Sequence, residues 1–211
     1  MGTRSAQASR PLDAELTGAR RVRWPLPDRL IWGNEPLPQP VVRFRPIGEH
    51  DLSRPDIAEF SCGDDPWQVK VATFLRSGRA WEVHQTGESE TLIFEDTVGG
   101  EVVGFANVFP DVKSWPKWNG KRRMPCLHIA WIAVAARHQG RGYGREIIEE
   151  LAARAIEADQ SGLYLLVDTR NEDAIRFYAR LGFREFGGAN LYRDDEDGSE
   201  NLRLFLPLFA E

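Results

Sequence analysis

Three glycines stand directly before a helical pattern in the stretch RHQGRGYGREII, which runs from Arg137 to Ile148. Glycine disfavours a helix, because its backbone loses more conformational freedom on folding than that of any other residue. An apolar run of strand character, CLHIAWIAV, ends at Val134 just before the stretch. The sequence therefore predicts a strand, a tight turn and a helix in succession, a unit that belongs to α/β folds.

Apolar periodicity and turn residues outline the other elements. Asp65 is suited to cap a helix that begins at Pro66, and Gly182 is suited to end a later one. The strand at 126–134 and the strand at 163–167 are joined by a crossover helix, so we expect them to be parallel. Further strands are predicted at VVRFRPI (41–47), TLIFED (91–96), EVVGFANVF (101–109), FREFG (183–187) and NLRLFLPLF (201–209), and further helices at DDPWQVKVATFLRSG (64–78) and NEDAIRFYARLGF (171–183).

Composition indicates a globular protein without a membrane segment. Of the 211 residues, 42% are hydrophobic and 28% are charged, and no apolar run approaches the roughly 18 residues that cross a bilayer. The first residues lack the apolar region of a secretory signal. Cys62 and Cys126 are the only cysteines, and their spacing suits no metal site, which favours a reducing compartment. We therefore expect a cytoplasmic protein with no metal ion.

Residues 1–40 differ from the rest of the chain. They contain six of the thirteen prolines and little periodicity, so we expect a Pro/Arg-rich, partly disordered N-terminal arm before one domain at 41–211. An arm draped over the domain and a loose leader both fit this pattern. Because the chain carries a net charge of −5 and residues 1–45 carry +4, residues 46–211 carry −9. A domain this acidic disfavours binding to nucleic acid.

A glycine-rich turn between a strand and a helix is suited to binding phosphate. The first backbone N–H groups of a helix are unpaired, and the helix dipole adds partial positive charge to them. Gly140, Gly142 and Gly144 have no Cβ to keep a phosphate oxygen away, and Arg141 or Arg145 would add a charged contact. The turn has neither the Lys-Ser/Thr of a P-loop nor the glycine spacing of the dinucleotide fingerprint.

Two motifs together resemble the GCN5-related N-acetyltransferases, the GNAT family. In IAVAARHQGRGYG, Gln139, Gly142 and Gly144 follow a strand in the order of the family's acetyl-CoA motif, Gln/Arg-x-x-Gly-x-Gly/Ala. One helix and one strand later come Asn171, Ala174, Phe177–Tyr178 and Gly182–Phe183, at the family's spacing. The resemblance covers roughly residues 41–206. It implies a mixed α/β (α+β) fold with a central, mostly antiparallel sheet of about six to seven strands flanked by helices.

The resemblance also implies acetyl-CoA as co-substrate, whose thioester is attacked directly by the amine of an acceptor. The pantetheine arm would pair with the strand at Ile132, Ala133 and Val134, and Asn171 would contact it. Tyr178 matches the family's tyrosine that protonates the leaving thiolate. The chain has Ala135–Ala136 where many relatives have Asp-Pro. The pyrophosphate would lie on the turn formed by Gln139, Gly140, Arg141, Gly142, Tyr143, Gly144 and Arg145.

The group that deprotonates the acceptor is less clear. Many relatives use a carboxylate on the strand before the glycines, and CLHIAWIAV has none. His128 is the candidate catalytic base, because it has the parity of Ile132 and an ordinary pKa near neutrality. A structural histidine fits the same pattern. His138 lies in the turn itself, where we expect it to face solvent.

The acceptor is the least constrained part of the prediction. The loop FPDVKSWPKWNGKRRMP (109–125) alternates basic residues and tryptophans, which suits an anionic acceptor, nucleic acid or a solvated loop. The segment that starts with FSCG at Phe60 resembles the opening of a GNAT toxin subclass that acetylates aminoacyl-tRNA. We expect a primary amine of a small molecule or a protein as acceptor. Charged tRNA and a non-catalytic, acetyl-CoA-binding regulatory module are the alternatives. The oligomeric state is open, and a homodimer is compatible with the sequence.

Overall fold

The computed structural model describes residues 42–110, 117–118, 122–123, 125–185, 191–193 and 200–208. The predicted N-terminal arm at 1–40 lies outside the described residues, as do most of the loop at 109–125 and most of the acidic segment RDDEDGSEN at 193–201. Of the loop at 109–125, two short strands are described, β4 (Lys117–Trp118) and β5 (Arg122–Arg123), which pair antiparallel.

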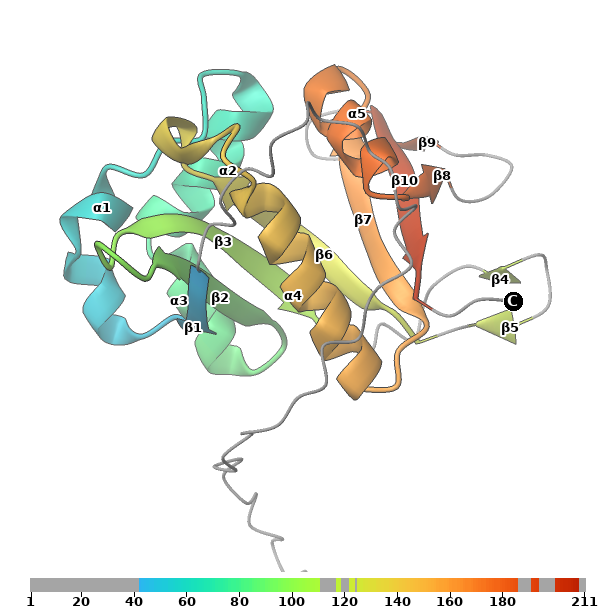
Figure 1. The fold of residues 1–211 in the computed structure, drawn as a ribbon, viewed down its shortest axis with the longest axis horizontal. Helices are drawn as coiled ribbons and strands as arrows, with labels where there is room; N and C mark the ends of the chain where they lie inside the picture. Colours follow the sequence, from blue (N-terminus) through green and yellow to red (C-terminus); the bar gives the residue numbers. More distant parts are fainter. Residues whose placement is uncertain are drawn as a thin grey trace, which may run out of the picture.

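One central sheet organises the chain (Figure 1). Its strands lie in the order β1-β2-β3-β6-β7-β10-β8, and the short β9 also pairs with β10. All neighbours are antiparallel except β6 and β7. The strands of this sheet are β1 (Val42–Pro46), β2 (Glu90–Asp96), β3 (Val102–Phe109), β6 (Leu127–Val134), β7 (Gly162–Asp168), β8 (Arg184–Glu185), β9 (Leu191–Arg193) and β10 (Glu200–Pro207).

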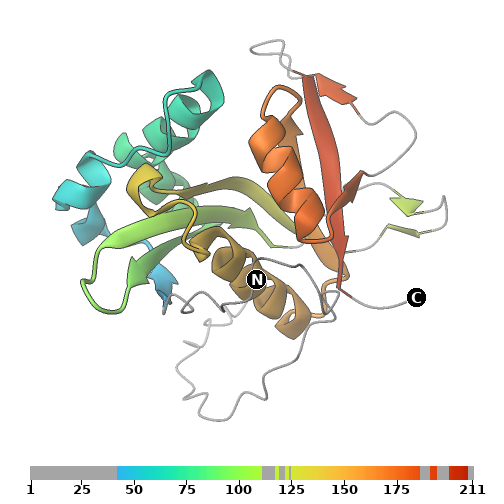
Figure 2. The same ribbon diagram turned by 45° about the horizontal axis from the view of Figure 1, so that its top comes forward.

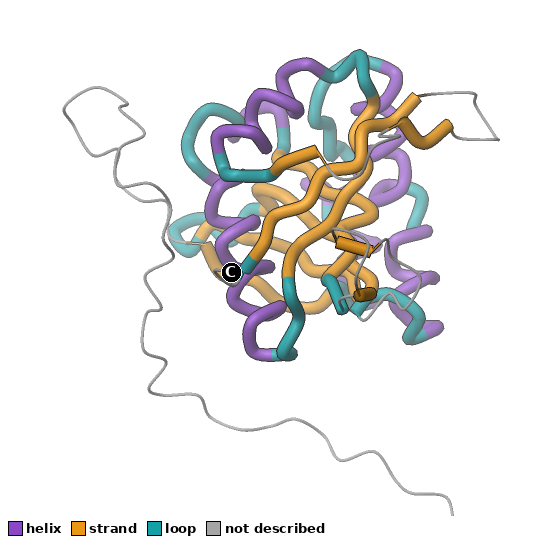
Figure 3. Tube along the Cα trace, turned by 90° about the vertical axis from the view of Figure 1, so that its right-hand side faces the viewer, coloured by secondary structure: helices purple, strands orange, loops and turns teal. Residues whose placement is uncertain are grey.

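The predicted fold class is confirmed: the protein has a mostly antiparallel sheet flanked by helices, with one parallel pair joined through a crossover helix. Helices lie on both faces of the sheet (Figures 2 and 3). The α-helices are α1 (Pro55–Ala58), α2 (Pro66–Arg76), α3 (Arg79–Thr86), α4 (Tyr143–Glu157) and α5 (Glu172–Arg180), and two 3₁₀ turns, η1 (Glu49–Ser53) and η2 (Ala136–His138), complete the described elements.

Helix α2 begins as predicted, and α3 was not predicted. The N–H of Asp65 donates to Gln68 Oε1 at 3.1 Å, and Pro66 occupies the first helical position. Gly78 was expected to end this segment. It follows the end of α2 with a left-handed φ of 82° and also serves as the N-cap of α3, so the chain starts a second helix after only Ser77 and Gly78.

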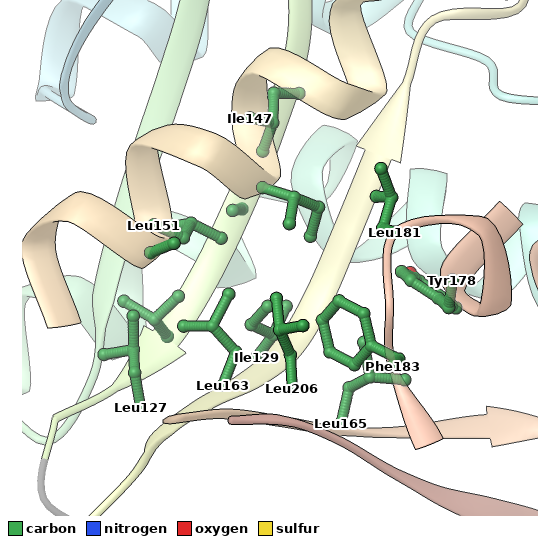
Figure 4. Close-up of a cluster of buried hydrophobic side chains, with 14 of the residues drawn as sticks. Leu127, Ile129, Ile147, Leu151, Leu163, Leu165, Tyr178, Leu181, Phe183 and Leu206 are labelled. Atoms are coloured by element: carbon green, nitrogen blue, oxygen red, sulfur yellow. The ribbon is translucent and has the colours of Figure 1, made fainter. Parts of the chain in front are cut away.

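Two hydrophobic cores lie on opposite faces of the sheet. One joins α4 and α5 to alternate residues of the strands; Figure 4 shows Ile147 and Leu151 of α4 above Ile129 and Leu163, with Tyr178 at its edge. The other joins α1, α2 and α3 to the opposite side chains of β2, β3 and β6. Because successive side chains of a strand point to opposite faces, the sheet separates the two cores.

An ion-pair network fixes the segment after β1. The carboxylate of Asp51 is fully buried and accepts hydrogen bonds from Arg45 at 2.6 and 2.7 Å and from the N–H of Gly48 at 2.8 Å. Burial by itself would raise the pKa of Asp51, but the hydrogen bonds from Arg45 and Gly48 outweigh it and lower the pKa. The charged form of Asp51 is therefore part of the folded structure.

A β-bulge divides β6. Trp131 pairs with Asn107 of β3 and Ile129 pairs with Val108, so Ala130 has no opposite residue. Leu127 and Ile129 pack in the core under α4, and after the extra residue Ile132 and Val134 do so. His128 was expected on the face of Ile132. That expectation is wrong, because the bulge inverts the alternation between the two positions.

The helices within the described ranges do not combine the length and apolar composition that crossing a bilayer requires.

Candidate active site

The parallel pair separates at its C-terminal end. Pairing between β6 and β7 covers Leu127–Leu163, His128–Tyr164 and Ile129–Leu165 only. Beyond Ile129, β6 continues along β3 to Val134 while β7 continues along β10 to Asp168. The two strands diverge toward the N-terminus of α4 and the N-terminus of α5 (Figure 1). The halves of β6 and β7 that no longer pair with each other therefore lie beside two helix N-termini.

The separation exposes one backbone edge of β6. The N–H of Ala135 donates to Val103 at 2.9 Å, and in an antiparallel ladder alternate residues point toward the same neighbour. Ala133 and Ala135 therefore point toward β3, whereas Ile132 and Val134 direct their backbone groups toward β7. In the described part of the chain no strand pairs with these two residues on that side. This edge is a template for an extended ligand that pairs as a strand does.

The turn after β6 presents unpaired N–H groups. Gly140 and Gly142 have left-handed φ values of 74° and 94°, which a residue with a Cβ adopts only under strain. Gly142 is the N-cap of α4 and its carbonyl accepts from Arg145, yet within the described residues the N–H groups from Gly140 to Gly144 donate no hydrogen bond. Several donors at the positive end of a 15-residue helix form a site suited to an anion.

Gly144 has a packing role that the sequence did not indicate. It has no left-handed φ, and a Cβ at this position would lie 3.1 Å from Cζ of Phe177 on α5. The glycine therefore lets α4 approach α5 closely. The side chain of Tyr143 is buried and its hydroxyl lies 3.4 Å from Asp96 Oδ2, so only its backbone faces the turn. Arg141 and Arg145 are both exposed beside these N–H groups, with Arg145 paired to Glu149.

Gln139 holds the turn through its side chain. Its Nε2 donates to the carbonyl of Cys62 at 2.8 Å and to the carbonyl of Val134 at 3.1 Å. The N–H of Ala136 also donates to the carbonyl of Ser61 at 2.7 Å. An amide supplies both donors in one group, which a carboxylate cannot do. Gln139 thus links the end of β6 to the segment before α2.

The second motif lies across the separation, on β7 and α5. Asn171 is the N-cap of α5, and its Oδ1 accepts from the N–H of Ala174 at 3.2 Å. Tyr178 is buried at the edge of the α4 core, with ring contacts to Phe177 and Phe183 at 5.2 and 5.3 Å between centroids. Burial raises the pKa of Tyr178 well above its ordinary value, so its phenol stays protonated.

His128 lies on the face of the sheet opposite α4. Its ring stacks on Phe109 with centroids 5.8 Å apart and contacts Tyr164 at 5.3 Å. Burial lowers the pKa of His128 to about 4, because desolvation disfavours the charged ring. The imidazole is therefore neutral at pH 7. It can accept a proton, but it is a weak base toward an ammonium group.

His138 was expected to face solvent, and that expectation is wrong. Only 6% of the residue is exposed, its ring packs edge-on against Tyr143 at 5.7 Å, and its Nε2 lies 3.1 Å from Glu101 Oε2. The partner is 37 residues away in the sequence, in the β2–β3 hairpin, so a local pattern could not indicate the contact.

Within the described ranges, His, Cys, Asp and Glu residues do not gather in groups of three that could hold a metal ion.

The fold and the site thus define a class of α/β proteins that offer a separated parallel strand pair beside an anion-suited helix N-terminus. The model of the Acetyltransferase (GNAT) family matches residues 55–183, which contain both of these elements. The chain belongs to the GNAT acetyltransferase family.

Several known proteins are similar to this chain in sequence or in fold. Streptothricin acetyltransferase of Streptomyces lavendulae is 34% identical over 110 residues, 51% of this chain and 53% of that protein, so the chain spans about half its length. The N-alpha-acetyltransferase RimI of Mycobacterium tuberculosis is 29% identical over 133 residues, 62% of this chain and 69% of that protein. The structure of an AtaT toxin variant, bound to the C-terminus of the antitoxin AtaR and acetyl-CoA, shares the fold with a TM-score of 0.56 and 19% identity, covering 79% of this chain and 93% of that one.

Proposed function

We propose that this protein is an acetyl-CoA-dependent N-acetyltransferase that transfers the acetyl group to a primary amine of a small molecule or a protein. The observation that carries the proposal is the joint placement of two features at one end of β6. Among the described residues, no strand pairs with β6 on the open side of Ile132 and Val134, and the N–H groups from Gly140 to Gly144 beside them donate no hydrogen bond. An extended amide-containing arm that ends in a pyrophosphate matches both at once.

Different residues at the turn and on β6 would bind different parts of the co-substrate. The N–H groups of Gly140, Gly142 and Tyr143 would receive the pyrophosphate oxygens, and Arg141 would add a charged contact from the surface. Gln139 keeps the turn in place through its two hydrogen bonds. The arm of the co-substrate would exchange backbone hydrogen bonds with Ile132 and Val134, as a neighbouring strand does. Asn171 would bind the arm from the side of β7 with its amide nitrogen.

The reacting groups would lie where the two strands separate. The acceptor amine attacks the thioester carbonyl, and the bulge at Ala130 turns a backbone N–H of β6 out of the regular ladder, where it would stabilise the oxyanion. The phenol of Tyr178 stays protonated, so it would donate a hydrogen bond, or its proton, to the leaving thiolate. His128 is neutral and would act as a proton acceptor of low basicity, so we expect most of the amine to lose its proton to water.

A transfer assay tests the proposal. Acetyl-CoA labelled in the acetyl group is added with the full chain to a cell lysate, and label is measured in small molecules, proteins and charged tRNA. Label in the first two fractions supports an amine acceptor. Binding of acetyl-CoA without label in any fraction would indicate a regulatory module, and no binding of acetyl-CoA would refute the proposal.

The role of Tyr178 is tested by Tyr178→Phe. The variant keeps the ring contacts with Phe177 and Phe183 and loses the hydroxyl. We expect kcat to fall by about 10²-fold with little change in acetyl-CoA affinity, since general acid catalysis contributes typically about 10²–10⁴-fold. Full activity of the variant would remove Tyr178 from the chemistry.

Acetylation of charged tRNA is the second candidate. Two observations favour it: the segment from Phe60 has the opening residues of the toxin subclass, and the AtaT toxin shares the fold. The charge of −9 on residues 46–211 opposes it. Label in the tRNA fraction of the same assay would establish this activity in place of the first.

A further inference from the structure

The turn between β6 and α4 is not fixed by its own hydrogen bonds. The N–H groups of His138 and Gln139 donate to carbonyls three residues back, and the next backbone bond begins at Arg145. Between them lie two glycines with left-handed φ, and a glycine can adopt many other backbone conformations at little cost in free energy. Contacts from other segments must therefore hold the N–H groups in their present directions.

The β2–β3 hairpin supplies such contacts from one side. Glu101 contacts both Arg137, which it pairs with closely, and His138, whose Nε2 lies 3.1 Å from Oε2. Asp96, on the facing strand, contacts the hydroxyl of Tyr143 at 3.4 Å. The N–H of Asp96 donates to the carbonyl of Glu101 at 2.9 Å, so the two acidic residues belong to one rigid pair of strand ends. We call these contacts the hairpin clamp.

Burying His138 at this place costs free energy of folding, so we infer that its contact with Glu101 has a function. It is 6% exposed, and its Nδ1 is buried with no hydrogen-bond partner in the described part of the chain. An unpaired buried polar atom destabilises a protein, and an apolar side chain of similar size would fill the same space without that loss. The polar contacts of the ring are made at the other nitrogen, Nε2, which lies 3.1 Å from Glu101 Oε2 and 3.3 Å from Nε of Arg137.

The clamp acts on the residues that face an anion. His138 precedes Gln139 and the two glycines with left-handed φ, and its ring packs against Tyr143, the first residue of α4. A shift of His138 would therefore turn the N–H groups at both ends of the glycine pair. On the opposite side the turn is held by Gln139 and Cys62, so the hairpin clamp is the second of two anchors.

We propose that Glu101 and His138 are positioning residues that set the affinity of the turn for the pyrophosphate of the co-substrate, acting through the backbone of residues 139–144. The inference rests on the proposed function. It assigns a role in donor binding to the β2–β3 hairpin, which lies on the side of β6 away from β7. The hairpin has no proposed contact with the thioester or the acceptor.

Two ligands separate this role from a merely structural one. Coenzyme A carries the pyrophosphate, and S-acetylpantetheine carries only the arm that would pair with β6. Dissociation constants of both for the full chain and its variants are measured by NMR titration. His138→Leu keeps the buried apolar volume and removes the contact with Glu101. We expect it to weaken coenzyme A about tenfold and to leave S-acetylpantetheine unchanged.

Matched variants complete the experiment. His138→Gln can still donate to Glu101 and should restore most of the coenzyme A affinity. Glu101→Ala should weaken coenzyme A about as much as His138→Leu, and because the Glu101 side chain is 40% exposed, it tests the clamp even if the core change at His138 prevents folding. Glu82→Ala removes an exposed carboxylate of α3 as a control. Equal weakening of both ligands, or no weakening by Glu101→Ala, would overturn the inference. Failure of the unmodified chain to bind coenzyme A would refute the proposed function itself.

Discussion

Replacing His128 by phenylalanine is expected to remove a dependence of stability on pH that the buried ring imposes. The pKa of His128 is about 4 in the folded chain because of desolvation, against an ordinary value of 6.5. Between these values the unfolded chain binds more protons than the folded one, so stability falls as pH falls from about 6.5 to about 4. Between pH 7 and pH 5 the two values give a loss of roughly 2 kcal/mol from this residue.

The assay is unfolding by urea at pH 7, 6 and 5, for the unmodified chain and for His128→Phe. The phenyl ring can keep the aromatic contacts with Phe109 and Tyr164 and does not titrate, so the change in stability between two pH values is compared within each chain. We expect the difference in unfolding free energy between pH 7 and pH 5 to be about 2 kcal/mol smaller in the variant. The titration of the ring followed by NMR gives the folded pKa directly. A value near 6.5, with equal pH dependence of the two chains, would refute the reasoning.

Three further changes follow from the contacts of the site and the core. Gln139→Glu places a carboxylate against two carbonyl oxygens, so calorimetry should show coenzyme A binding weakened at least about tenfold. Gly142→Ala puts a Cβ on a backbone with φ of 94°, and thermal unfolding should show a loss of about 1–2 kcal/mol, whereas Gly99→Ala, with open space around it, should lose none. Asp51→Asn removes the charge of a fully buried carboxylate that accepts two hydrogen bonds from the partly exposed Arg45, so urea unfolding at pH 7 should show a loss of about 2–3 kcal/mol; a loss below about 1 kcal/mol would contradict that account.

The elements that local chemistry specifies could be predicted from the sequence. The crossover rule gave the parallel pair of β6 and β7, and the Asp65–Pro66 start gave the first residue of α2. Helix α3 could not be predicted in this way, since Gly78 ends one helix pattern and begins another, and sequence alone does not distinguish a stop from a restart. The family motifs predicted the position of the turn. The structure adds that, among the described residues, its N–H groups from Gly140 to Gly144 donate no hydrogen bond.

Two features of the candidate site depend on contacts between distant segments. The face of His128 followed from strict alternation along the strand, and a bulge that depends on pairing with Asn107 and Val108 breaks that alternation. The burial of His138 depends on Glu101, and a histidine in a glycine-rich turn gives no local sign of such a partner. Gly144 also depends on a distant segment, because a Cβ at this position would crowd the ring of Phe177 on α5.

The bulge at Ala130 also determines which sequence changes this strand can tolerate. Ala130 is the residue that the regular alternation does not need: with or without it, Ile129 and Ile132 point toward α4 and Trp131 points toward Phe74. Deleting Ala130 would therefore restore a regular ladder without turning these side chains to the other face of the sheet. Deleting Ala133, beyond the bulge, would instead place side chains on the wrong face. Among related chains, changes in the length of β6 should therefore occur at the bulge and in the loops that enter and leave the strand.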